Sequence, residues 1–163
     1  MAAGATYTPI ATTTLGSAAA SYTFSSIPST YTDLIVIISG TTVSDAQDMS
    51  MQFNSDTGTN YSNTTLVGNG TTASSSRTTS QSKIYVINDT SNTSPSPIRI
   101  NIMNYANTTT YKTVVARGDD ATHRTQATVG LWRSTAAINA VTLLATSNFN
   151  TGATLTLYGI ASA

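Results

Sequence analysis

Short apolar clusters of strand length recur along the whole chain and limit its fold more than any other feature. In the clearest of them Ile98, Ile100 and Ile102 alternate with the residues between them. Alternation with a period of two places one set of side chains on each face of a β-strand. No segment has a convincing helical pattern, so the sequence predicts an all-β protein.

Turn residues separate these clusters and predict about eight or nine strands in one domain. The predicted strands are residues 21–25, 34–38, 49–53, 82–88, 98–105, 111–117, 127–133, 138–145 and 153–160. This pattern is typical of a β-sandwich with a jelly-roll-like arrangement, which we assign to residues 21–163.

Two segments outside this regular pattern carry their own expectations. Leu34–Ile38 is a continuous apolar run, which predicts a central strand covered on both faces. Residues 62–80 are almost wholly Ser, Thr, Gly and Asn, which predicts a long loop that is functional or mobile.

Residues 1–20 are small and polar, with Tyr7, Ile10 and Leu15 as isolated apolar positions. The segment is either an extended arm that docks on a neighbouring subunit or a first edge strand of the chain's own sheet. In the first case the three apolar residues are candidate interface residues. The N-terminus has no basic region followed by an apolar one, so no signal peptide is predicted.

The composition argues against most chemistry. The chain has no Cys, one His and only 9% charged residues, and all seven acidic residues are Asp. Catalytic nucleophiles, general bases and metal sites draw mainly on the residue types that are scarce here. We therefore expect neither enzyme activity nor a cofactor or metal ion.

Charge and hydropathy also argue against two classes of partner. The formal net charge is zero and the seven basic residues are scattered, whereas nucleic-acid binding needs clustered Lys and Arg. No stretch of eighteen or more apolar residues is present, so no membrane-spanning segment is expected.

The Asn54–Asn60 loop, with Asp56 and Gly58, has the oxygen-rich composition of a calcium loop. In the known twelve-residue calcium loop Gly is sixth and Glu twelfth, whereas here Gly is fifth and Glu is absent. A turn that is closed by its own Asn and Asp side chains is the favoured interpretation, and ion binding stays open.

Three further sets of residues are candidates for catalysis or binding. His123 follows Asp119 and Asp120, but the nucleophile motif of a Ser-His-Asp hydrolase is absent. A glycosidase would need two facing carboxylates, and neither that pair nor Asp45 with Asp48 has a supporting spacing. Trp132 is either a core residue or an exposed one that stacks on a sugar or anchors an interface, so it is a fourth candidate interface residue.

Three stretches resemble a known family. They are Tyr22–Ile35, Phe53–Ser62 and the closing Gly152–Ile160. Together they are similar to small virion structural proteins of tailed bacteriophages, particularly marine and cyanobacterial phages. The resemblance implies a β-sandwich, often trimeric, without enzyme activity, and it leaves residues 62–100 unmatched.

The resemblance implies a capsid decoration (cement) protein that binds the major capsid protein as a homotrimer. Such a protein would be made in the host cytoplasm and would reside on the capsid surface of the virion. The N-terminal segment and residues 62–80 are the expected contacts. The alternative is a tail-associated or fibre-tip module that recognises host glycans through Trp132, the tyrosines and the Asn-rich loops.

Overall fold

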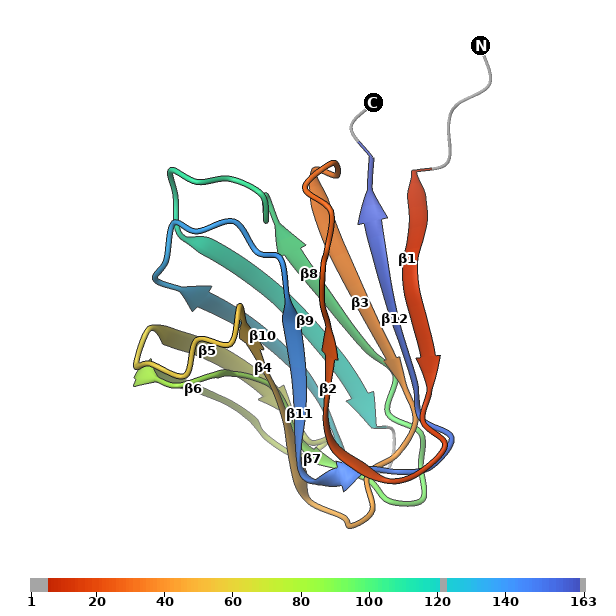
Figure 1. Cartoon of the computed structure of the whole chain (residues 1–163). Coiled ribbons are helices and arrows are strands. Elements are labelled where there is room, and N and C mark those ends of the chain that lie inside the picture. The colour runs from red at the N-terminus through yellow and green to blue at the C-terminus, as the bar shows by residue number, and fades with distance from the viewer. Residues whose placement is uncertain (1–5, 121–122, 162–163) are drawn as a thin grey trace.

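The computed structural model describes residues 6–120 and 123–161, and for Asp119 and Asp120 it describes the backbone alone. Among these residues there are twelve strands and no helix, and every strand pair is antiparallel. The strands form an eight-stranded sheet and a four-stranded sheet that face each other (Figure 1). The predicted all-β sandwich is confirmed, but the expectation of about eight strands was too low.

The strands follow the chain in order. They are β1 (Tyr7–Thr14), β2 (Ala19–Phe24), β3 (Asp33–Ser39), β4 (Gln47–Phe53), β5 (Tyr61–Gly68), β6 (Ala73–Gln81), β7 (Ile84–Thr90), β8 (Ile98–Met103), β9 (Lys112–Asp120), β10 (Arg124–Trp132), β11 (Val141–Phe149) and β12 (Thr154–Ile160).

Eight of these strands have the nested pairing of a jelly roll. β1 pairs with β12, β2 with β11, β3 with β8 and β4 with β7. The β12–β3 and β11–β4 pairs then join them into one four-strand layer in each sheet. This connectivity gives the jelly roll its two facing sheets. We call these eight strands the jelly-roll half.

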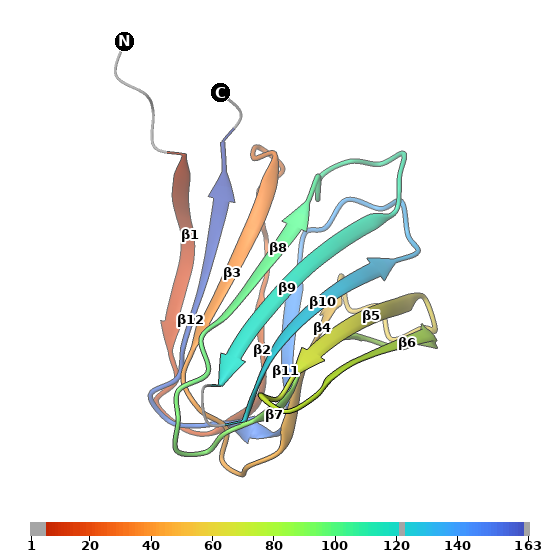
Figure 2. The ribbon, with the colours of Figure 1, turned by 180° about the vertical axis from the view of Figure 1, so that it is seen from behind.

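The other four strands form two hairpins, β5–β6 and β9–β10, which we call the hairpin extension. They continue the larger sheet beyond β8 in the order β9-β10-β5-β6, as Figure 2 shows from behind. The prediction of a long loop over residues 62–80 was wrong, because most of that segment is β5 and β6. The Thr residues of this segment favour strands. The segment lacks an apolar pattern that would reveal a strand in the sequence, and the backbone of β5 finds its hydrogen-bond partners in β10.

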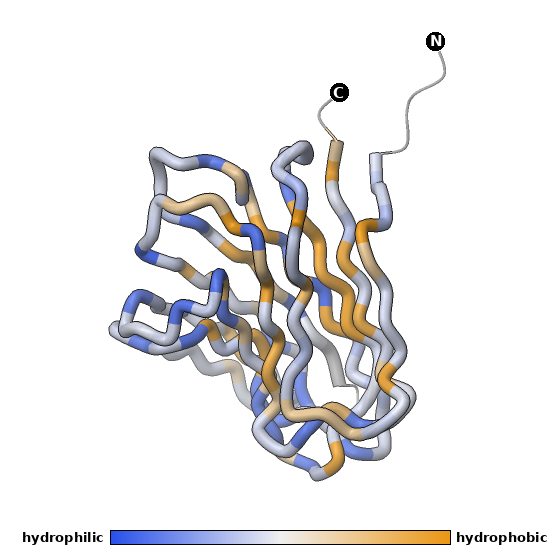
Figure 3. The backbone as a smooth tube through the Cα atoms, in the orientation of Figure 1, coloured by the Kyte–Doolittle hydropathy of each residue, from blue (hydrophilic) through white to orange (hydrophobic). Residues whose placement is uncertain are grey.

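The apolar core lies between the two sheets, mostly within the jelly-roll half, and it continues into the hairpin extension through Tyr61, Val114, Ala116 and Trp132. Leu34, Val36 and Ile38 point into it from β3 and are at most 1% exposed. Ile37 on the opposite side of β3 is 37% exposed, so the expectation that this strand is covered on both faces was wrong. Figure 3 shows the strongest hydrophobic colour along the strands of this half and a paler β5–β6 hairpin.

The hairpin extension packs against β7 instead of a full second sheet. Two glycines let β7 come close: a Cβ atom at Gly130 would lie 2.6 Å from Ile84 Cγ2, and one at Gly118 would lie 2.3 Å from Ile87 Cδ1. Residues of β6 other than Gln81 are all exposed, so this last strand depends on its pairing with β5.

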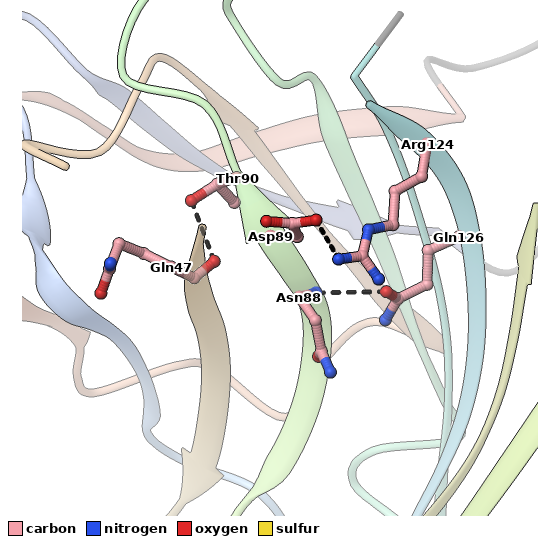
Figure 4. Close-up of polar contacts among 6 residues, drawn as sticks. All are labelled: Gln47, Asn88, Asp89, Thr90, Arg124 and Gln126. Atoms are coloured by element: carbon pink, nitrogen blue, oxygen red, sulfur yellow. Dashed lines mark hydrogen bonds and ion pairs between the residues drawn. The ribbon is translucent and has the colours of Figure 1, made fainter. Parts of the chain in front are cut away.

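Polar side chains line the buried side of the extension. Gln126 is fully buried, and its Oε1 accepts a hydrogen bond from the Asn88 backbone N–H at 3.2 Å (Figure 4). Its Nε2 donates to Thr128 Oγ1 at 3.1 Å, and Thr128 in turn lies 3.3 Å from Thr65 Oγ1. Hydrogen bonds thus satisfy polar atoms that would otherwise be costly to bury.

Candidate functional site

The largest uncovered surface is the face of the eight-stranded sheet that points away from the four-stranded sheet, which we call the outer face. The pairing register places Ile37, Arg99, Arg117, Ala127 and Leu66 in one row across it. Residues directly opposite each other in antiparallel strands share a face, so this row crosses from β3 to β5.

A second row runs parallel to the first across the same face. It contains Asn101, Val115, Val129, Thr64 and Arg77, from β8 to the edge strand β6. The outer face therefore carries aliphatic side chains and arginines in regular rows across the sheet.

Exposed apolar side chains gather on the outer face. Eight large hydrophobic residues of the described chain are exposed, and all except Val43 and Tyr111 belong to it. The six are Tyr7, Ile37, Leu66, Met103, Val115 and Val129. Single exposed apolar residues are ordinary, whereas a concentration on one face marks an interaction surface.

Three of the seven basic residues also lie there, namely Arg77, Arg99 and Arg117. A shallow hollow of about 420 Å³ is lined by Arg99 and Arg117 together with Asn101, Met103 and Val115. Aliphatic residues, Met and Arg are the combination that protein interfaces favour over Lys and acidic residues.

Tyr7 is the candidate interface residue that the structure places on the outer face. Its ring is 46% exposed and meets the Tyr158 ring edge-on at 6.2 Å between centroids. Arg99 Nη2 donates to the Tyr7 hydroxyl at 2.9 Å. Ile35 shares this face in the register with Tyr158 yet is only 2% exposed, so these larger side chains cover it.

The structure places the other two N-terminal candidates elsewhere. Strand β1 is an edge strand paired with β12, and Ile10 sits at its bulge, partly buried against the core. Leu15 is 9% exposed and belongs to the core. Burial within the chain's own sandwich thus takes up the side chain of Leu15 and part of that of Ile10.

Trp132 also lies in the core, which corrects its place among the candidate interface residues. It is 2% exposed, and its ring stacks on Tyr61 at 6.3 Å and lies 5.4 Å from Phe53. Its Nε1 donates to Asp56 Oδ2 at 2.7 Å. Stacking on a sugar or a partner is therefore closed to this side chain.

The Asn54–Asn60 loop serves the same aromatic cluster. Asp56 accepts hydrogen bonds from Gly58 N at 2.8 Å and Asn60 Nδ2 at 2.9 Å, besides that from Trp132. Burial raises the pKa of Asp56, but these hydrogen bonds outweigh it, so the pKa is lowered. This is the favoured turn, with a carboxylate turned toward N–H donors of the protein.

The residues considered for catalysis do not form a recognisable active site in the described part of the chain. The side chains of Asp119 and Asp120 lie outside the described residues. His123 is exposed and borders a polar hollow of about 370 Å³ with the Asp89–Arg124 ion pair and Asn69. Asp45 Oδ1 accepts from the Asn92 N–H at 2.7 Å. No described group of three His or Asp residues is arranged to hold a metal.

One buried titratable group was not singled out from the sequence. Lys112 is 1% exposed, and its Nζ donates to the carbonyls of Thr110 at 2.9 Å and Thr135 at 3.2 Å. Burial lowers the pKa of Lys112. The ammonium thereby ties the loop after β8 to the loop after β10.

The three stretches that carry the family resemblance hold several of the internal contacts of the sandwich. Tyr31 from the first stretch packs on Gly159 from the last, where a Cβ atom would lie 2.3 Å from the Tyr31 ring. The middle stretch contains the Asp56 turn and Tyr61. The resemblance therefore concerns how the sandwich is built.

No protein-family model matches the chain, and no curated protein matches it either. Among solved structures, an exo-inulinase from Aspergillus awamori is similar at 14% identity and a TM-score of 0.51. The match covers 94% of this chain but 29% of the exo-inulinase, so the chain spans under a third of that protein. This likeness concerns the fold alone.

Two further solved structures align more weakly. They are the C2A and C2B domains of Extended-Synaptotagmin 2, with 6% identity over 82% of this chain and 42% of that one, and an infectious bursal disease virus structure, with 16% identity over 94% and 42%. Their TM-scores are 0.17 and 0.11, which carry no argument. Separately, no helix suited to crossing a membrane occurs in the described chain.

Proposed function

We propose that the protein is a non-enzymatic structural component of a bacteriophage virion that binds the capsid shell as a decoration protein. The observation that carries the binding role is the outer face, which gathers six exposed hydrophobic residues on one face of the large sheet. The resemblance of the three stretches to phage virion proteins is the reason for proposing a phage capsid as the binding partner. The low content of catalytic residue types fits a role in which the protein works by contact.

In this proposal the outer face lies against the major capsid protein, and many copies act on one shell. Modest affinity at each contact is sufficient, because bound neighbours raise the local concentration of binding sites. A homotrimer is compatible with the fold, since β1, β2, β6 and β7 each form the end of a sheet.

The test is binding to purified phage particles from which the protein has been stripped. Val115→Asp places a charge on the outer face and is expected to abolish cosedimentation with the particles. Val43→Asp is a matched control, because Val43 and Val115 are both 46% exposed but only Val115 lies on that face. Equal binding by both variants, or native particles that hold only a few copies, would contradict the proposal.

A second candidate function is recognition of host glycans by a tail-associated module. It is favoured by the polar hollow beside the Asp89–Arg124 pair, which Asn69, Thr72 and Ser74 also line. A glycan array distinguishes the two: binding that is lost in Asp89→Asn and kept in Val115→Asp would favour this function over capsid decoration.

A further inference from the structure

Arg99 on β8 and Arg117 on β9 are directly opposite each other on the outer face. Like charges at directly opposite positions of an antiparallel pair destabilise a sheet. Arginine keeps its charge at every physiological pH, so the two guanidinium groups cannot escape this repulsion by losing a proton. The presence of two arginines at these opposite positions is explained if a negatively charged group binds between Arg99 and Arg117.

The protein supplies no described carboxylate for this pair. Arg117 makes no hydrogen bond or ion pair with any side chain that the structure describes. Of the five described carboxylates, only Asp33 is on a strand of the large sheet, and its Oδ1 accepts from the Asn104 N–H at 2.6 Å. Among the described side chains, Tyr7 and Asn101 accept from Arg99 and none accepts from Arg117.

One of the two guanidinium groups is already held in place. Arg99 Nη2 donates to the Tyr7 hydroxyl at 2.9 Å, and its Nε lies 3.3 Å from Asn101 Oδ1. The guanidinium also lies 5.9 Å from the centre of the Tyr7 ring. A donor that is fixed before binding loses less entropy when the ligand arrives.

Both arginines border two neighbouring hollows. The hollow of about 420 Å³ lies toward Met103 and Val115, and a second one of about 190 Å³ lies toward Ile37 and Pro97. An anionic group between the arginines would thus have aliphatic surface on either side. Planar guanidinium groups bind carboxylates through two parallel hydrogen bonds, which gives the contact both strength and direction.

We infer that Arg99 and Arg117 form a binding site for an Asp or Glu carboxylate on a partner protein's surface. The aliphatic side chains that line the two hollows favour a protein over an acidic glycan, because protein interfaces combine apolar residues with Met and Arg. That the partner is a capsid protein rests on the proposed function, whereas the carboxylate site itself does not.

The test uses the full chain, and the probe is the peptide N-acetyl-triglutamate. Its addition is expected to shift the backbone amide NMR signals of β8 and β9, with at least a tenfold weaker affinity in Arg117→Gln. Arg77→Gln is the matched control, because it removes one positive charge from the same face three strands away. Equal weakening in both variants would show a mere effect of net charge and overturn the proposal.

A second readout does not depend on any ligand. Relief of the repulsion is expected to raise the Tm of Arg117→Gln by about 2 °C, and this also shows that the variant folds. A lowered Tm would mean that Arg117 has a stabilising partner within the chain. Tighter binding of trigalacturonate or inorganic phosphate than of the peptide would also overturn the proposal. Peptide binding without particle binding would refute the capsid role alone.

Discussion

The jelly-roll half and the hairpin extension bury their inner faces in different ways. In the first, two sheets enclose aliphatic and aromatic side chains such as Val36, Phe53 and Leu157, each fully buried. In the second, one strand, β7, lies under β9 and β10, and the buried positions include Gln126 and Thr128. Contacts between apolar side chains do not depend strongly on orientation, whereas each buried polar group needs a correctly placed hydrogen-bond partner.

This difference explains how one chain of this size can carry a sheet face eight strands wide. The jelly-roll half provides stability through burial of apolar area, which is the main favourable term in folding. The extension widens the sheet without needing an equally large second layer. The outer face then spans both regions without a break, from Tyr158 on β12 to Arg77 on β6.

The comparison is tested most strongly by Leu157→Ala in the jelly-roll half. Leu157 is fully buried, so loss of its side chain should lower the free energy of unfolding by about 3 kcal/mol, as measured by urea denaturation. Leu66→Ala in the extension is the control. Leu66 is 59% exposed, and the expected loss is about 0.5 kcal/mol or less. Similar losses would mean that the Leu157 side chain adds no more to stability than one exposed on the outer face.

Gln126→Ala tests the polar side of the comparison. The change removes a fully buried side chain, leaves the partly buried Asn88 N–H without its acceptor and should cost about 2 kcal/mol in the free energy of unfolding. Gln81→Ala serves as the control, since Gln81 bonds only the nearby Thr79 carbonyl on the edge strand. If Gln126→Ala costs no more than the control, water must replace the lost hydrogen bonds and the polar layer is looser than described.

The smallest expected effect concerns Asp56, where the two regions meet. Its pKa is lowered in the folded protein, so its contribution is present above the unfolded value near 3.8 and is lost as the pH falls through the folded pKa. Asp56→Asn should therefore cost about 1 kcal/mol at pH 7, when an amide replaces the hydrogen-bonded carboxylate.

Urea denaturation of the wild type and Asp56→Asn between pH 7 and pH 2 measures this effect. The difference in the free energy of unfolding should stay constant down to about pH 4 and then shrink. A difference that persists unchanged at pH 2 would show that the negative charge of Asp56 is not needed for the turn. The shape of the side chain, rather than the hydrogen bonds that the charged carboxylate accepts from Trp132, Asn60 and Gly58, would then fix the turn.

The elements that could be predicted are those whose residues alternate along the chain. Ile98, Ile100 and Ile102 gave β8 correctly, and the predicted strands at 111–117 and 127–133 correspond to β9 and β10. The β5–β6 hairpin was missed because its Ser and Thr residues lack an apolar period. Its order comes from pairing with β10, more than fifty residues further along the chain.

The candidate site was harder to predict than the fold. Tyr7 was singled out as an isolated apolar residue and does lie on the outer face. Leu15 was singled out on the same ground and Trp132 for its aromatic ring, and both are buried. Residue type alone cannot separate these cases, because exposure depends on which sheet face each strand position occupies.

The sequence by itself determined the all-β class, the jelly-roll-like sandwich and most of the strands, because a period of two follows from the geometry of a single strand. Only the tertiary structure decided which residues form the outer face. Arg99 and Arg117 are eighteen positions apart, and nothing local marks them as neighbours. They meet because β8 and β9 pair in one register. A shift of one strand by one residue would place the two side chains on opposite faces of the sheet.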